Sequence, residues 1–171
     1  MSNRNRTQDK YTNVLNVSVT QSSANTLTFE EVDVGLNLFD RVGLLISRME
    51  YYNNEEGELA ANGDYIRMAL TASNQITTIS AQERAVIAMM EKQVIDHGTP
   101  ASATLVHEPW VQDWSSLPGG GLLVAPKPLY VACSSAGLSA ASRTDLRMFF
   151  TIIKLRDADY FELVESRRFF S

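Results

Sequence analysis

The side chains suited to metal binding or nucleophilic chemistry are few in this chain. It has two histidines, His97 and His107, and one cysteine, Cys133. Zinc sites take three or four ligands in a fixed geometry, and His107 and its neighbour Glu108 would point to opposite faces of an extended segment. A nucleophilic cysteine needs a base and an electropositive setting, and the sequence indicates neither for Cys133. We therefore expect no metal, no cofactor and no enzymatic activity, and we interpret Cys133 as a buried strand residue.

Two further groups of residues have types that can carry a function. Asp157, Asp159 and Glu162 would suit acid–base chemistry, but their spacing equally fits the negative charge that the first turn of a helix favours, and we adopt that interpretation. Trp110 and Trp114 are four residues apart, so both indoles would share one face of an extended segment and could stack on a sugar ring. We favour aromatics of the core or of a subunit interface, and the alternative function is a carbohydrate-binding β-sandwich module.

The composition is that of a globular domain, with 44% hydrophobic and 20% charged residues in a chain of 171. A net charge of −5 argues against a strongly nucleic-acid-binding surface. Residues 1–12 are interpreted as a flexible N-terminal arm, in which Arg4, Arg6 and Lys10 allow a weak nucleic-acid contact. The sequence has no run of about 18 apolar residues, so we expect no membrane span. One cysteine cannot form an intrachain disulfide, which favours synthesis in a cytoplasm.

Alternation of apolar and polar residues predicts a mainly β domain over residues 13–171. Segment 145–155 is apolar on both faces and predicts a central strand, with Leu146, Met148 and Phe150 on one face. In segment 39–52, simple alternation places Ser47 and Met49 on the same face. Segment 26–34 changes phase, which predicts a bulge or a turn near Glu30 and Glu31. Further strands are expected within 14–19, 64–71, 105–114 and 122–134.

A capping box predicts one substantial helix between Ser80 and Gln93. Ser80 and Glu83 would satisfy each other's backbone N–H groups, and apolar residues follow at helical spacing. Asp157 is expected to cap a short C-terminal helix. The predicted fold is therefore an antiparallel β-sandwich or single jelly roll, with one helix in a connection and a short helix at the end.

The C-terminal third resembles a known family. Its segments GGLLVAP (120–126), LYVA (129–132), RMFFTIIKL (147–155) and DYFEL (159–163) are similar to the end of viral single jelly-roll capsid proteins, of the type found in tailless icosahedral viruses. The resemblance implies an eight-stranded sandwich that packs with copies of itself, and with other capsid proteins, into the shell of a virion. It also implies synthesis in the host cytoplasm and a structural role without catalysis.

A shell subunit works through its surfaces and termini. Phe169 and Phe170 are costly to leave in water, each being worth roughly 1.5–3 kcal/mol when buried, so we expect them to occupy a groove on their own domain or on a neighbouring subunit. The resemblance to shell proteins favours the neighbouring subunit. The full set of candidate interface residues is Arg4, Arg6, Tyr51, Tyr52, Trp110, Trp114, Arg167, Arg168, Phe169 and Phe170.

Overall fold

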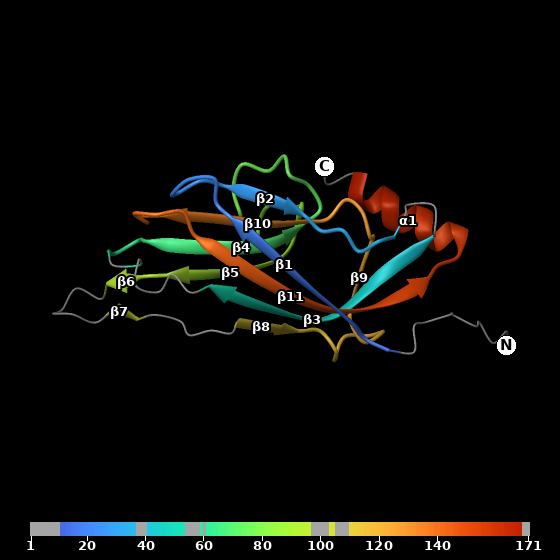
Figure 1. Cartoon of the computed structure of the whole chain (residues 1–171). Helices are drawn as coiled ribbons and strands as arrows, with labels where there is room; N and C mark the ends of the chain where they lie inside the picture. The colour runs from blue at the N-terminus through green and yellow to red at the C-terminus, as the bar shows by residue number, and fades with distance from the viewer. Residues whose placement is uncertain are drawn as a thin grey trace.

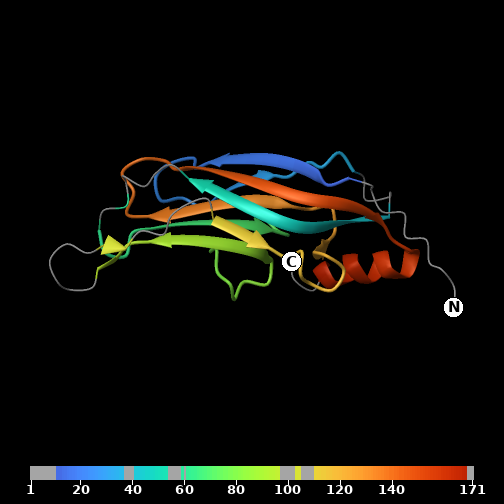
Figure 2. The ribbon, with the colours of Figure 1, turned by 90° about the horizontal axis from the view of Figure 1, so that it is seen from below.

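The computed structural model describes residues 11–36, 41–53, 59, 61–96, 103–104 and 110–168. Two antiparallel sheets pack face to face, and one helix lies at the opposite end of the molecule from the β6–β7 hairpin (Figures 1 and 2). The elements are β1 (Asn13–Thr20), β2 (Thr28–Glu31), β3 (Val42–Asn53), β4 (Tyr65–Thr71), β5 (Val86–Gln93), β6 (Ile95–Asp96), β7 (Ala103–Thr104), β8 (Trp110–Asp113), β9 (Leu122–Val124), β10 (Tyr130–Ala136), β11 (Arg143–Lys154) and α1 (Asp157–Arg168).

The strand order is that of a jelly roll. Sheet A has the order β1-β11-β3-β8, with β9 also paired to β3, and sheet B has the order β2-β10-β4-β5. Strands β8 and β9 pair with successive halves of β3, so together they occupy one edge position. The chain passes from one sheet to the other between principal strands, except at the β4–β5 hairpin. This arrangement confirms the predicted fold class.

Strand β11 is central and apolar on both faces, as predicted. It pairs with β1 on one side and β3 on the other. Leu146, Met148 and Phe150 lie in the core between the sheets, whereas Ile153 belongs to a second apolar cluster around α1. The period-2 alternation of a strand therefore gives each face of β11 its own packing partner.

The simple alternation predicted for β3 is wrong. The pairing of β3 with β11 shifts by one residue and leaves Ser47 as an extra residue, so that Leu44 and Ile46 before it and Met49 and Tyr51 after it all enter the core. A bulge has this effect because one unpaired residue reverses the phase of the strand. The Ser47 carbonyl accepts a hydrogen bond from the backbone N–H of Trp114 (2.8 Å), which follows β8.

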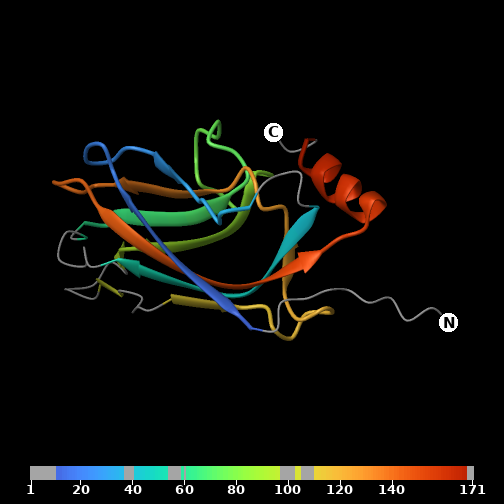
Figure 3. The same cartoon turned by 45° about the vertical axis from the view of Figure 1, so that its right-hand side comes forward.

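The bulge or turn predicted near Glu30 and Glu31 is also wrong, because β2 runs through both residues and its pairing with β10 has no shift. Its change of phase has another cause: each face of this segment packs against a different apolar cluster. Leu27 and Phe29 pack on the outer face of sheet B, where Ile79 of the β4–β5 connection is buried, and Val32 lies in the core between the sheets. Figure 3 shows this connection rising over sheet B.

The helix predicted between Ser80 and Gln93 is wrong, because most of this segment is strand β5. The Ser80 Oγ accepts a hydrogen bond from the N–H of Gln82 (3.2 Å), and the Glu83 carboxylate accepts one from Ala85 (3.5 Å). These bonds close turns instead of a capping box. Pairing with β4 then satisfies the backbone groups on one side of β5, while Ala88 and Met90 enter the core.

The short C-terminal helix is present as predicted and begins at Asp157. Asp157 pairs with Arg41 (2.6 Å), and Asp159 pairs with Arg156 (2.8 Å). Tyr160, which directly follows Asp159, packs with Leu45 and its neighbours on the outer face of sheet A. The acidic residues of the first turn are thus engaged in structural ion pairs, which supports their structural interpretation. The helix is not long and apolar enough to cross a membrane.

Candidate binding surface on the outer face of sheet A

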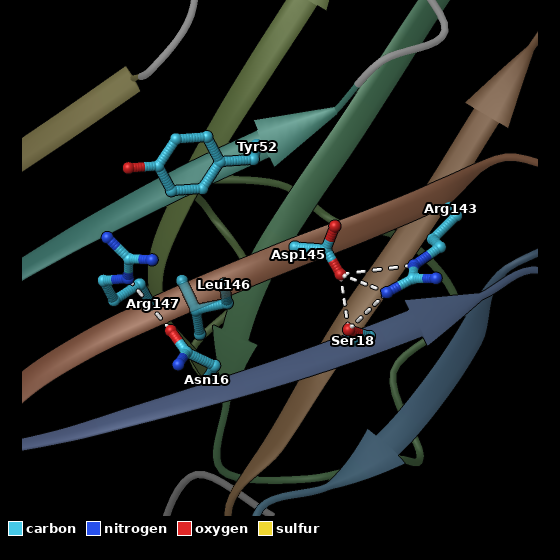
Figure 4. Close-up of a pocket in the computed structure, with 7 residues that line it drawn as sticks. All are labelled: Asn16, Ser18, Tyr52, Arg143, Asp145, Leu146 and Arg147. Carbon is cyan, nitrogen blue, oxygen red and sulfur yellow. Dashed lines mark hydrogen bonds and ion pairs between the residues drawn. The ribbon is translucent and has the colours of Figure 1, made fainter.

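The outer face of sheet A carries a cluster of polar side chains, here called the polar face. They come from alternate positions of three neighbouring strands, because successive side chains of a strand point to opposite faces. A depression of about 440 Å³ lies among them (Figure 4). The polar face consists of Asn16 and Ser18 of β1, Arg48, Glu50 and Tyr52 of β3, and Arg143, Asp145 and Arg147 of β11.

Glu50 organises one half of the polar face. It is only 6% exposed, yet its carboxylate lies among three donors. One oxygen contacts a guanidinium nitrogen of Arg48 (2.5 Å), and the other accepts a hydrogen bond from the Tyr52 hydroxyl (2.7 Å) and lies 3.6 Å from Arg147 Nη1. A buried carboxylate is tolerated when it is paired in this way. Glu50 therefore holds two guanidinium groups and a phenol in place.

Arg147 joins this group to β1. Its Nε donates a hydrogen bond to Oδ1 of Asn16 (2.9 Å), and its guanidinium lies over the Tyr52 ring, 5.7 Å from the centroid. Within the described part of the chain, Arg147 Nη2 and Asn16 Nδ2 have no hydrogen-bond partner in the protein. Both nitrogens are therefore available as donors to a ligand.

A second polar group lies on the other side of Leu146 in Figure 4. Asp145 Oδ1 accepts hydrogen bonds from the Ser18 hydroxyl and from Nε and Nη2 of Arg143 (3.3 and 3.1 Å). Arg143 Nη2 also donates to the Ser18 oxygen (3.2 Å). Among the described residues nothing donates to Asp145 Oδ2, which is thus a free acceptor.

The hydrogen bond to Glu50 raises the pKa of Tyr52, and burial and the negative charge of Glu50 act in the same direction. Tyr52 consequently stays a neutral donor. In the described residues no three His, Cys, Asp or Glu side chains are grouped as metal ligands. His97 and His107 lie outside those residues. Burial raises the pKa of Cys133, which accepts a hydrogen bond from Thr144 Oγ1 (3.2 Å) as a core residue.

The structure separates the predicted interface residues. Tyr51 is completely buried and its hydroxyl donates to Gln112 (3.1 Å), so it is not available as a contact residue, whereas Tyr52 lies on the polar face. Trp110 is partly exposed on edge strand β8, but Trp114 packs against the main core. The two indoles therefore do not form one exposed platform for a sugar.

The remaining predicted interface residues belong to the two termini. Arg167 and Arg168 form the end of α1. Arg4, Arg6, Phe169 and Phe170 lie outside the residues that the structure describes, and so do the side chains of Arg167 and Arg168.

Exposed apolar side chains form a second surface feature, at the two edges of sheet A. Eight large apolar residues are exposed in the described part of the chain, and six of them lie at or next to β1 and β8–β9. The six are Tyr11 and Val14 at the β1 edge and Trp110, Val111, Leu117 and Leu123 at the β8–β9 edge.

Most of the polar face was not predicted from the sequence. The available signal was the polar residues that alternate with core residues in β3 and β11. That signal does not show which strands are neighbours: Arg147 and Asn16 are 131 positions apart.

Burial raises the pKa of Tyr51 well above its ordinary value of 10.0. In the unfolded chain this phenol ionises from about pH 10, whereas in the folded protein it stays neutral, so its stabilisation is complete below pH 10 and is lost as pH rises further. The free energy of unfolding should fall there by up to about 1.4 kcal/mol per pH unit for this group. In urea unfolding between pH 8 and 11.5, the free energy of unfolding of Tyr51→Phe should fall less steeply with pH than that of the wild type. Tyr11→Phe, at an exposed site, is the control, and equal slopes for Tyr51→Phe and the wild type would contradict this assignment.

The comparisons with known proteins add no relative to this picture. No family model matches the chain, and no curated protein is significantly similar to it. The described geometry defines a jelly-roll protein with a polar sheet face and two apolar edges.

Proposed function

We propose that this chain is a self-assembling structural protein, a shell subunit of a virion that packs through its edges and termini. The observation that carries the proposal is the concentration of exposed apolar side chains at two opposite edges of sheet A. Scattered apolar residues on a surface are ordinary, but groups of them mark contact sites. The occupant that we propose is a second copy of the chain.

The two edges favour a closed assembly over a simple dimer. The β1 edge and the β8–β9 edge carry different side chains and lie at opposite ends of the strand order. A contact between unlike surfaces is heterologous, and it produces rings or closed shells when its rotation closes. Each edge strand also offers unpaired backbone groups that a neighbouring subunit can cover.

The jelly-roll order and the resemblance of the C-terminal third to viral capsid proteins support the same proposal. They would place the protein in the virion after synthesis in the host cytoplasm, together with any other capsid proteins. Contact between the arm at residues 1–12 and nucleic acid stays part of the proposal. The alternative of a carbohydrate-binding module built on Trp110 and Trp114 is weakened, because Trp114 packs against the core.

Electron microscopy and mass photometry of the purified full chain test this function. We expect rings or closed particles of uniform size that form above a threshold concentration. A chain that stays a single subunit at every concentration, and that binds neutral glycans in a Trp110-dependent way, would contradict assembly and support the alternative module.

A further inference from the structure

We propose that the depression on the polar face binds a saccharide that carries a carboxylate, such as a sugar of the uronic or sialic acid class. The depression borders the β1 edge through Asn16 and Ser18, but the inference does not depend on the chain forming a shell. It uses the groups of the polar face that the fold leaves without partners.

The charge of the depression selects an anionic ligand. The side chains of Arg147 and Arg143, which line the depression, are 46 and 62% exposed, whereas Glu50 beside Arg147 is buried. Among the residues that line the depression, solvent therefore meets two guanidinium groups and one carboxylate, that of Asp145. The planar fork of a guanidinium matches a carboxylate in two parallel hydrogen bonds, and Arg147 Nη2 is a free donor.

The free acceptor on Asp145 distinguishes a sugar from a simple polyanion. Oδ2 of Asp145 needs a donor, and it would repel a ligand that offers only negatively charged acceptors. Sugar hydroxyl groups donate and accept, so one ring can donate to Asp145 and accept from Nδ2 of Asn16. The phosphate groups of a nucleic-acid backbone only accept hydrogen bonds, so they offer no donor to this carboxylate. The mixture of free donors and a free acceptor thus favours a hydroxylated acid.

The shape and rigidity of the depression fit a ligand of one or two sugar rings. Its volume of about 440 Å³ is within the range of small-molecule sites. Figure 4 shows Tyr52 beside Arg147, whose guanidinium lies over the Tyr52 ring. Because Glu50 already holds Tyr52 and Arg147, little side-chain freedom is lost when a ligand binds.

Saturation-transfer NMR and calorimetry on the full chain test the proposal with matched sugars. The acidic probes are 3′-sialyllactose and glucuronic acid, and the neutral probes are lactose and glucose. We expect at least one acidic probe to bind at least about tenfold more tightly than its neutral counterpart, because a charged hydrogen-bonded pair is lost in the latter.

The matched variants are Arg147→Lys and Arg156→Lys. Arg147→Lys keeps a positive charge beside Glu50 but loses the planar fork, and it should weaken binding of the acidic sugar roughly ten- to hundredfold. Arg156 pairs with Asp159 near α1, so Arg156→Lys makes the same chemical change away from the depression and should leave binding unchanged. Melting temperatures of both variants should match the wild type.

Three outcomes would overturn the proposal. The first is the absence of binding by both acidic probes, and the second is equal binding of acidic and neutral sugars. The third is binding of a single-stranded oligonucleotide, and of neither acidic sugar, that Arg147→Lys abolishes; the polar face would then be a nucleic-acid surface. Each result can be scored whether the protein is a particle or a single subunit, so it is distinguishable from a failure of the shell proposal.

Discussion

Val111→Lys is expected to dissociate the proposed assembly into single subunits. Val111 is 40% exposed on edge strand β8, within the apolar edge that we assign to subunit contact. Burying a lysine charge in that contact costs several kcal/mol without a partner, and loss of an interface anchor costs 2 kcal/mol or more, which is about 30-fold per contact. A shell repeats the contact in every subunit, so the threshold concentration for assembly should rise well beyond that factor.

The isolated subunit should tolerate the same change. Val111 is exposed in the single chain, so the new ammonium group stays in water there. We expect the free energy of unfolding to change by no more than about 0.5 kcal/mol. Val111→Thr is the control, because it keeps the β-branched shape and adds no charge, and it should still assemble. Particles of Val111→Lys that form at the wild-type concentration would contradict the assignment of this edge.

Gln21→Leu is expected to lower the free energy of unfolding by about 3 kcal/mol. Gln21 is buried where β1 leaves sheet A, and its side-chain oxygen accepts hydrogen bonds from the Ser135 hydroxyl and the Ser142 N–H (3.0 Å each). Its amide nitrogen donates to the carbonyl of Thr26. Leucine fills the space but leaves these buried groups without partners, at about 1–3 kcal/mol for each unsatisfied group.

Thermal and urea unfolding measure this effect. For a chain of this length, 3 kcal/mol corresponds to a fall in Tm of roughly 6–12 °C. Gln75→Leu is the control, because Gln75 is exposed in the β4–β5 connection and its side-chain amide donates to the neighbouring Asn74 (2.8 Å). That variant should stay within about 0.5 kcal/mol of the wild type. If Gln21→Leu has the same Tm as Gln75→Leu, the hydrogen bonds of Gln21 do not link the strands as described.

The fold class was predictable because it depends on local patterns. In β11, apolar residues on both faces indicated a central strand, and the many short strand segments with few helices indicated a sandwich. Asp157 marked the start of α1, since the charges of a first turn are a local feature. The pattern of Ser80 and Glu83 gave a wrong helix prediction because their hydrogen bonds are local and fit a turn as well as a helix cap. Pairing with β4 decided that the segment after them is a strand.

Composition and the alternation of apolar and polar residues by themselves determined that this is a mainly β domain. The two-residue period of this alternation and the scarcity of long apolar runs are properties of the sequence alone. Only the tertiary structure decided the bulge at Ser47 and the polar face around Glu50. A bulge depends on the register of a partner strand, and the partners of Glu50 and Arg147 come from strands far apart in sequence. Sheet pairing selects those neighbours through the packing of the opposite, apolar face, so the candidate site arises as a consequence of how the core packs.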